Sequence, residues 1–228
     1  MSSTVRIGFL LFPEFLQLDF TGPYAVLAAG PGAEVHLIGK DVAPVLSSDN
    51  LLFTPKVRMD ACPQLNVLCV PGGQGIQALL SDGDTLAFIR RQAENCLYLC
   101  SVCTGALVLG AAGLLCGYKV TTHWQSLEFL ADFGAEAQHQ RVVVDRNRIS
   151  AAGVSAGIDM ALTLAGMLWG VAAAQEIQLG MEYAPTPPYT SGSPNTAPPS
   201  VLAAVKSRTA ARQEARREAV RQAAALLR

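Results

Sequence analysis

The chain has 228 residues, half of them hydrophobic and 15% charged, with a formal net charge of −1. This composition fits one α/β domain with a sizeable core, or at most two small domains. The charge balance gives no reason to expect nucleic acid or an anionic membrane as a partner. The six cysteines lie mostly in apolar runs and no signal peptide precedes them, so we expect a protein of the reducing cytoplasm.

Near-continuous apolar runs of strand length predict strands that are covered on both faces of a parallel sheet. Such strands are expected over 5–12, 33–38 and 66–70 and directly before Cys103, with shorter ones within 43–59 and over 119–122, 142–144 and 148–151. Helices are expected over 23–29, 84–95 and 124–133. The alternation predicts an α/β fold with helices on both faces of a mostly parallel sheet, whose sites form at the carboxyl ends of its strands.

The last third of the chain holds three distinct segments. Residues 157–174 are apolar enough to cross a bilayer, but Asp159 and two glycines favour a fully buried core helix. Residues 184–199 are rich in Pro, Ser and Thr and predict a non-helical arm, which a basic helix over 201–228 follows. We therefore expect an α/β domain over 1–183, with the arm and last helix of 184–228 packed on that domain or on a second subunit.

Cys103 stands at the turn of Ser101-Val102-Cys103-Thr104-Gly105, between a buried strand and a helix of small residues. This spacing is typical of a nucleophile elbow, and a helix start lowers the pKa of a thiol. The alternatives are a buried structural cysteine, or a redox dithiol formed with Cys100. Cys100 lies inside the apolar strand, and no second Cys/His pair completes a zinc site, so a reactive single cysteine is favoured.

Two loops supply candidate partners for the sulfur. Pro71-Gly72-Gly73 follows a buried strand, and its N–H groups can form an oxyanion-type nest or belong to an ordinary loop. Asp19 follows the first strand, where it can act as a general acid/base or cap the next helix. Glu14 is the rival carboxylate of the same loop.

His123 ends a short predicted strand, where it can orient the thiol or serve a structural role. The apolar character of the surrounding loops predicts an apolar substrate pocket.

Several motifs together resemble the ThiJ/PfpI superfamily, and most closely its isocyanide hydratase branch. They are FLLFPEFLQLDFTGPYAVL, VLCVPGGQG, SVCTGALVLGAAGLL, KVTTHW, GVSAGIDMALTL and the arm EYAPTPPYTSGSPNTAPPS. Protease-like members have His where this chain has Thr104, and amidotransferases have Gly where it has Ser101. The helix-turn-helix region of related regulators is not recognised after the domain.

The resemblance implies a flavodoxin-like sandwich, a homodimer, and a catalytic set of Cys103 as nucleophile, Asp19 as acid/base and Thr104 as supporting neighbour. It further implies that Gly73 donates an N–H on the oxyanion side. The expected substrate-binding residues are Gly72, Gly73, His123, Gly153 and Val154.

The expected reaction is hydration of an isocyanide to an N-substituted formamide through a cysteine thioimidate, without metal or organic cofactor. Two alternatives stay open: glyoxalase- or deglycase-type chemistry on α-oxoaldehydes, and a non-catalytic redox sensor or stress protein.

Overall fold

The computed structural model describes residues 4–227. Its strands are β1 (Val5–Leu10), β2 (Ala33–Gly39), β3 (Val45–Leu46), β4 (Leu52–Phe53), β5 (Val57–Arg58), β6 (Val67–Val70), β7 (Tyr98–Val102), β8 (Lys119–Val120), β9 (Glu136–Ala137), β10 (Val142–Asp145) and β11 (Arg148–Ala151). Its helices are α1 (Gln17–Leu27), α2 (Ile76–Leu79), α3 (Gly83–Ala93), α4 (Gly105–Ala111), the 3₁₀ helix η1 (Trp124–Phe133), α5 (Ala156–Trp169), α6 (Val171–Gly180) and α7 (Pro199–Ala225).

A seven-stranded sheet with the order β10-β11-β7-β6-β1-β2-β5 forms the centre of the molecule. All pairings in this sheet are parallel except β10 with β11, which the turn at Arg146 and Asn147 joins. The residues of β6 are all buried, and so are those of β7 after its first, because helices cover both faces. The predicted α/β class and mostly parallel sheet are confirmed.

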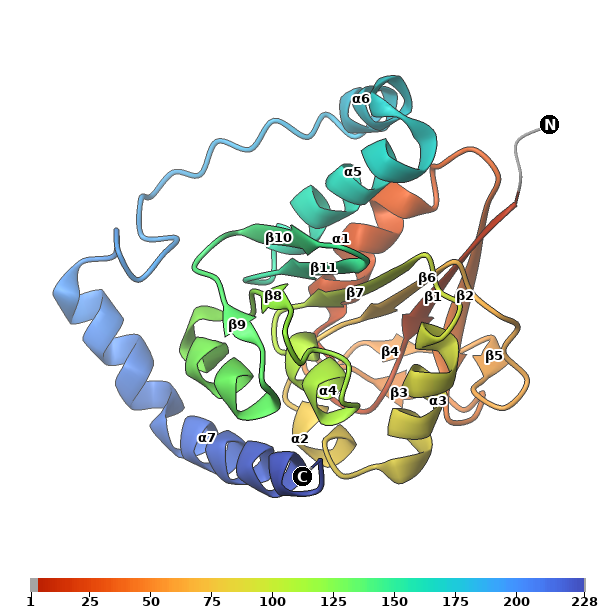
Figure 1. Ribbon diagram of the computed structural model, residues 1–228. Coiled ribbons are helices and arrows are strands. Elements are labelled where there is room, and N and C mark those ends of the chain that lie inside the picture. Colours follow the sequence, from red (N-terminus) through yellow and green to blue (C-terminus); the bar gives the residue numbers. More distant parts are fainter. Residues whose placement is uncertain (1–3, 228) are drawn as a thin grey trace.

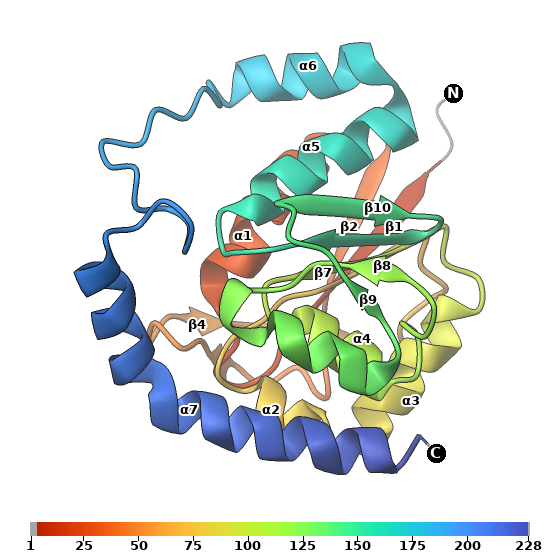
Figure 2. The ribbon, with the colours of Figure 1, turned by 60° about the vertical axis from the view of Figure 1, so that its left-hand side comes forward.

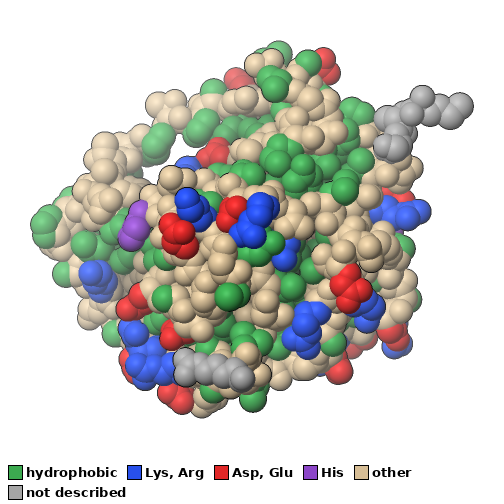
Figure 3. All heavy atoms as spheres, viewed as in Figure 1, with side chains coloured by type: hydrophobic (Ala, Val, Ile, Leu, Met, Phe, Trp, Pro, Cys, Tyr) green, Lys and Arg blue, Asp and Glu red, His purple; other side chains and the backbone are tan. Residues whose placement is uncertain are grey.

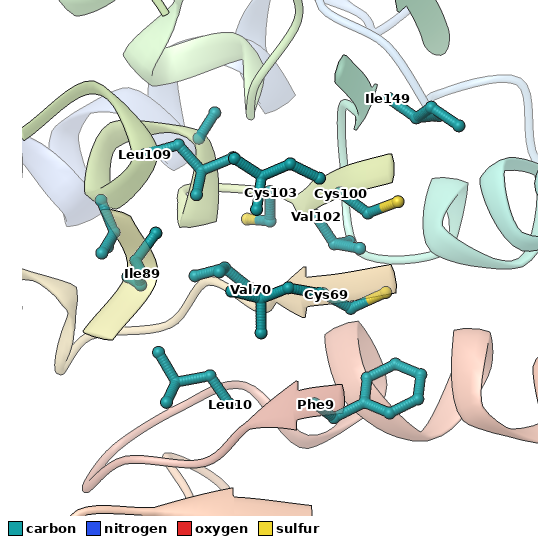
Figure 4. Packing of buried hydrophobic residues seen from close by; sticks show 14 of the residues in the cluster. Phe9, Leu10, Cys69, Val70, Ile89, Cys100, Val102, Cys103, Leu109 and Ile149 are labelled. Atoms are coloured by element: carbon teal, nitrogen blue, oxygen red, sulfur yellow. The ribbon is translucent and has the colours of Figure 1, made fainter. Parts of the chain in front are cut away.

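Figure 1 shows the two helical layers: α1 and α5 lie on one face of the sheet, and α2, α3 and α4 lie on the other. The core lies between these layers and the sheet. Figure 4 shows its centre, where side chains of β1, β6 and β7 pack together with Leu109 of α4 and Ile149 of β11. Because β1, β6 and β7 are parallel neighbours, the loops that follow them meet at one edge of the sheet.

Two predicted helices differ from those observed. The helix expected from Pro23 begins already at Gln17, so Asp19 lies buried in its first turn and does not cap it; Leu16 holds the cap position without a side-chain hydrogen bond. Pro23 lies inside this helix, beyond the first turn where proline is usually accommodated.

The single core helix expected over 157–174 is also wrong, because Gly170 (φ 88°) separates α5 from α6. Most of α6 is exposed, including Leu179 with 82% of its surface accessible, and Figure 3 shows hydrophobic side chains gathered over the α5–α6 region. Within residues 4–227, no helix has the length and apolarity that a membrane span requires.

Helix α7 packs on its own chain, across η1 and α4, and Figure 2 shows it running past α2 and α4 on the side away from the sheet. Polar contacts hold it there: Gln125 Nε2 donates to Thr209 Oγ1 (2.7 Å), and Arg217 Nη2 pairs with Glu128 (2.7 Å). The helix predicted over 201–228 is thus found at Pro199–Ala225, and Arg228 lies outside the described residues.

Candidate active site

Cys103 stands between β7 and α4 with a backbone φ of 55°, a left-handed conformation that non-glycine residues seldom adopt. Its N–H donates to Ala151 O (3.0 Å), and the Thr122 hydroxyl donates to its carbonyl (2.6 Å). Gly105 allows the turn to pack tightly, since a Cβ there would lie 2.1 Å from Val70 O. The neighbouring strands therefore hold Cys103 in the strained turn expected of a nucleophile elbow.

Asp19 reaches the same place from α1. Its Oδ2 accepts a hydrogen bond from the Gly72 N–H (2.9 Å), and the side chain is only 1% exposed. Desolvation raises the pKa of Asp19 to about 7, although the Gly72 N–H and the Cys103 thiol both act to lower it. Its Oδ1 is buried without a hydrogen-bond partner of standard geometry. The predicted proximity of Asp19 and Cys103 is present.

The sequence-based expectation of a lowered Cys103 pKa is wrong. Desolvation raises the pKa of the buried thiol far above its usual value, and Asp19 adds to this effect. The backbone N–H and the hydroxyl of Thr104, together with the charge of Arg216, act to lower the pKa but do not offset burial. Helix α4 has only seven residues, and its dipole does not offset the loss of hydration of the Cys103 side chain. The resting group is a thiol with an acid/base of pKa near 7 beside it.

Thr104 and the two glycines form the floor of the site. The Gly73 N–H donates to Thr104 Oγ1 (3.2 Å) and the Gly72 N–H donates to Asp19. Neither amide is therefore the free oxyanion-side donor that was expected of this loop, because each one positions a side chain of the site. A Cβ at Gly72 would lie 2.6 Å from Thr104 Oγ1 and 2.9 Å from Asp19 Oδ2, so only glycine fits between them.

The thiol opens into a cavity of about 260 Å³. It is lined by residues of the loops after β1, β6 and β11, the 47–50 turn, the elbow, the start of η1 and helix α7. These residues are Leu16, Ser48, Asp49, Gly73, Gln74, Cys103, Thr104, His123, Gln125, Val154, Arg212, Gln213 and Arg216. Polar residues outnumber apolar ones in this lining, but Leu16, Cys103 and Val154 contribute apolar surface, so the pocket is mixed and not apolar as expected. The prediction considered only the sheet-edge loops, whereas α7 brings two arginines to the wall.

The remaining predicted binding residues are divided between two cavities. Val154 and His123 line the cavity of Cys103 and also a neighbouring cavity of about 460 Å³, whereas Gly153 lines only the second. Burial and the charges of Arg212 and Arg216 lower the pKa of His123 to about 4, so its imidazole is neutral at pH 7. Its Nδ1 accepts a hydrogen bond from the Gln125 N–H (3.4 Å).

Glu14 and Cys100 are not part of the Cys103 cavity. The Glu14 side chain is exposed, and its carbonyl accepts hydrogen bonds from the N–H groups of Gln74 and Gly75. Figure 4 shows the sulfurs of Cys100 and Cys103 pointing in opposite directions, with that of Cys100 beside Cys69. The geometry therefore favours Asp19 over Glu14 and gives no support to a dithiol. Across residues 4–227, no three His, Cys, Asp or Glu side chains are grouped closely enough to hold a metal ion.

The contribution of α7 to the site was not predicted, because a helix rich in Arg and Lys is most often solvated. Arg216 is 4% exposed, and its Nη1 donates to Ser126 Oγ (3.3 Å) and Gln213 Oε1 (3.5 Å). A signal was present, because Thr209, Arg216, Val220 and Ala223 follow the spacing of one buried helix face. An arginine within that stripe indicates a charge directed into the protein.

Comparison with known proteins identifies the family of the chain. Residues 5–167 match the DJ-1/PfpI family. The chain is 53% identical over 206 residues to an isonitrile hydratase of Pseudomonas putida, which covers 90% of each protein. It is 34% identical over 168 residues to the HTH-type transcriptional regulator GbdR of Pseudomonas aeruginosa, matching 46% of that protein's length.

Solved structures of this family superpose on the chain. A ThiJ/PfpI family protein from Pseudomonas syringae superposes with a TM-score of 0.93 at 39% identity, over 97% of this chain and 91% of that one. Drosophila melanogaster DJ-1beta shares the fold, with a TM-score of 0.73 at 22% identity over 80% of this chain and all of the other. The chain belongs to the DJ-1/PfpI family, as its motifs indicate.

Proposed function

We propose that this protein is an isocyanide hydratase, which converts an isocyanide and water to an N-substituted formamide. The observation that carries the proposal is the buried Cys103–Asp19 pair, in which Cys103 lines a small cavity and Asp19 lies behind it beside the thiol. The isonitrile hydratase of Pseudomonas putida, 53% identical over 90% of both chains, supports the same reaction. Isonitrile and isocyanide are two words for one functional group.

The first step joins the sulfur to the isocyanide carbon. With a pKa of about 7, Asp19 is partly ionised at neutral pH, and its carboxylate accepts the thiol proton as Sγ of Cys103 attacks the terminal carbon of R–N≡C. Asp19 then gives this proton to the same carbon, which yields the thioimidate R–N=CH–S–Cys103. Coupling proton transfer to attack matters because the raised pKa of Cys103 disfavours a free thiolate.

The second step releases the product. Asp19 accepts a proton from water, the resulting hydroxide adds to the thioimidate carbon, and Asp19 gives the same proton to the nitrogen. Collapse of this tetrahedral adduct breaks the C–S bond and forms the C=O bond of the formamide, and the hydroxyl proton of the adduct passes to the sulfur. The Gly72 N–H positions the carboxylate of Asp19, and the Gly73 N–H positions the Thr104 hydroxyl, which acts on the Cys103 thiol.

Two observations bear on the alternatives. Chemistry on α-oxoaldehydes that uses a glutamate would draw on Glu14, whose side chain is exposed and absent from the cavity lining. A peroxide sensor needs a thiolate at rest, whereas burial raises the pKa of Cys103. Both observations favour the hydratase.

The test is a parallel assay with an alkyl isocyanide and with methylglyoxal, in which formamide and lactate are measured. We expect formamide from the wild-type protein and none from Cys103→Ala. Turnover of methylglyoxal alone would assign the site to the glyoxalase class. Turnover of neither substrate, with sulfinic acid formed at Cys103 under peroxide, would assign it to a redox sensor. The homodimer and the cytoplasmic location stay predictions.

A further inference from the structure

The wall of the Cys103 cavity contains a buried guanidinium that has no counter-ion. Arg216 is 4% exposed, and both of its hydrogen-bond partners, Ser126 and Gln213, are neutral. Its Nε is buried without a partner, and within residues 4–227 no carboxylate forms an ion pair with it. Buried arginines are normally paired because an uncompensated charge is strongly unfavourable away from water. The unpaired guanidinium of Arg216 therefore points to a ligand that supplies the missing negative charge.

A second arginine stands one helical turn before the first. Arg212 lines the same cavity at an exposed position and is likewise without an ion pair in the described part of the chain. Both arginine charges reach into the cavity, because they add to the effect of burial in lowering the pKa of His123. The carboxylate groups nearby are Asp19, which faces the thiol, and Asp49, which is exposed on the cavity lining. With Asp19 engaged in the chemistry, two arginines opposed by Asp49 leave one net positive charge, which matches a monoanion.

We propose that the substrates are isocyanides that carry a carboxylate, with the carboxylate bound by Arg216 and Arg212 while the isocyano carbon lies at Cys103. The proposal rests on the hydratase function proposed above and names the class of its substrate. A guanidinium fork matches the two oxygens of a carboxylate, and such charge-assisted hydrogen bonds are strong in a desolvated site. The cavity volume of about 260 Å³ restricts the substrate to a small molecule.

The direct test compares 4-isocyanobutanoate with its neutral methyl ester. For the wild-type protein we expect a higher kcat/KM with the carboxylate. Arg216→Gln should reduce the carboxylate-to-ester ratio by about tenfold or more, the size expected for loss of a charge-assisted hydrogen bond. Arg208→Gln removes the same charge from an exposed position of α7 outside the cavity, and it should leave the ratio unchanged.

Two outcomes would overturn the proposal: an Arg216→Gln protein with an unchanged ratio, or one in which both substrates lose the same factor. The second result would show that Arg216 serves the thiol or the fold. If Arg216→Gln does not fold, Arg212→Gln at its exposed position removes the other positive charge of the proposed carboxylate site. This variant should also lower the carboxylate-to-ester ratio.

A readout that needs no hydratase activity separates this proposal from the proposed function. Cys103 can be alkylated with iodoacetate, an anion, or with neutral iodoacetamide, and the exposed Cys116 of the same chain serves as the reference. We expect the iodoacetate-to-iodoacetamide rate ratio to be higher at Cys103 than at Cys116, and Arg216→Gln to remove the difference. If both alkylation results are observed but neither isocyanide is hydrated, the hydratase function is wrong and the anion-binding site is supported. If isocyanides are hydrated and the alkylation ratios are equal, the anion site fails alone.

Discussion

Replacing Asp19 with Asn should stabilise the protein, and increasingly so as the pH rises. The carboxyl has a pKa of about 7 when folded and an ordinary value of 3.8 when exposed, so the folded state binds more protons between these values. Stability is therefore lost as the pH rises through this window, because an ionised Asp19 is held away from water. Asn cannot ionise, and its side-chain oxygen can still accept the Gly72 hydrogen bond.

The magnitude follows from the two pKa values. A difference between 3.8 and about 7 corresponds to about 4 kcal/mol at about 1.4 kcal/mol per pKa unit, and Asp19 is too deeply buried for solvent to screen this effect. Of this total, about 3 kcal/mol falls between pH 5 and pH 8. Urea unfolding at both pH values should thus show the advantage of Asp19→Asn over wild type growing by about 3 kcal/mol.

The matched control is Asp132→Asn, which removes a carboxyl group from an exposed position of η1 outside the site. A difference between Asp19→Asn and wild type that is the same at pH 5 and pH 8 would refute the reasoning. It would mean that Asp19 has an ordinary pKa and is not the proton carrier of the site.

Three further predictions concern the floor of the site and its protonation. Gly72→Ala places a Cβ 2.6 Å from Thr104 Oγ1, so urea unfolding should show a free energy of unfolding lower by about 1–3 kcal/mol, and kcat/KM should fall. Gly180→Ala is the control, because it has open space around it and should change neither quantity. Thr104→Val removes the acceptor of the Gly73 N–H and should lower kcat/KM about tenfold, with Thr104→Ser restoring most of it; equal rates for both variants would exclude a role for the hydroxyl. Initial rates of isocyanide hydration should rise with pH to a plateau, with a midpoint near 7, as Asp19 becomes ionised; a flat profile from about pH 5.5 to 8.5 would contradict its role as proton acceptor.

The sequence was informative where local patterns determine local structure. Apolar runs identified the central strands, and the spacing around Cys103 identified the strained turn, because both depend on neighbouring residues. The meeting of Asp19 with Cys103 followed from a general rule of parallel sheets, since the loops after β1 and β7 open at one edge.

Properties that arise from tertiary packing could not be predicted in this way. Burial reverses the direction in which a helix start moves the pKa of Cys103. The cavity has a charged wall because α7, more than 90 residues further along the chain, places Arg212 and Arg216 beside the elbow. The break at Gly170 depends on a positive φ that an apolar run does not reveal.

The central claim is that Cys103 bonds to the isocyanide carbon. Mass spectrometry after brief mixing with an alkyl isocyanide and an acid quench tests it most directly. The account predicts a mass increase equal to one isocyanide on the peptide that contains Cys103, with no adduct and no formamide from Cys103→Ala. Formamide production that survives in Cys103→Ala would contradict the account.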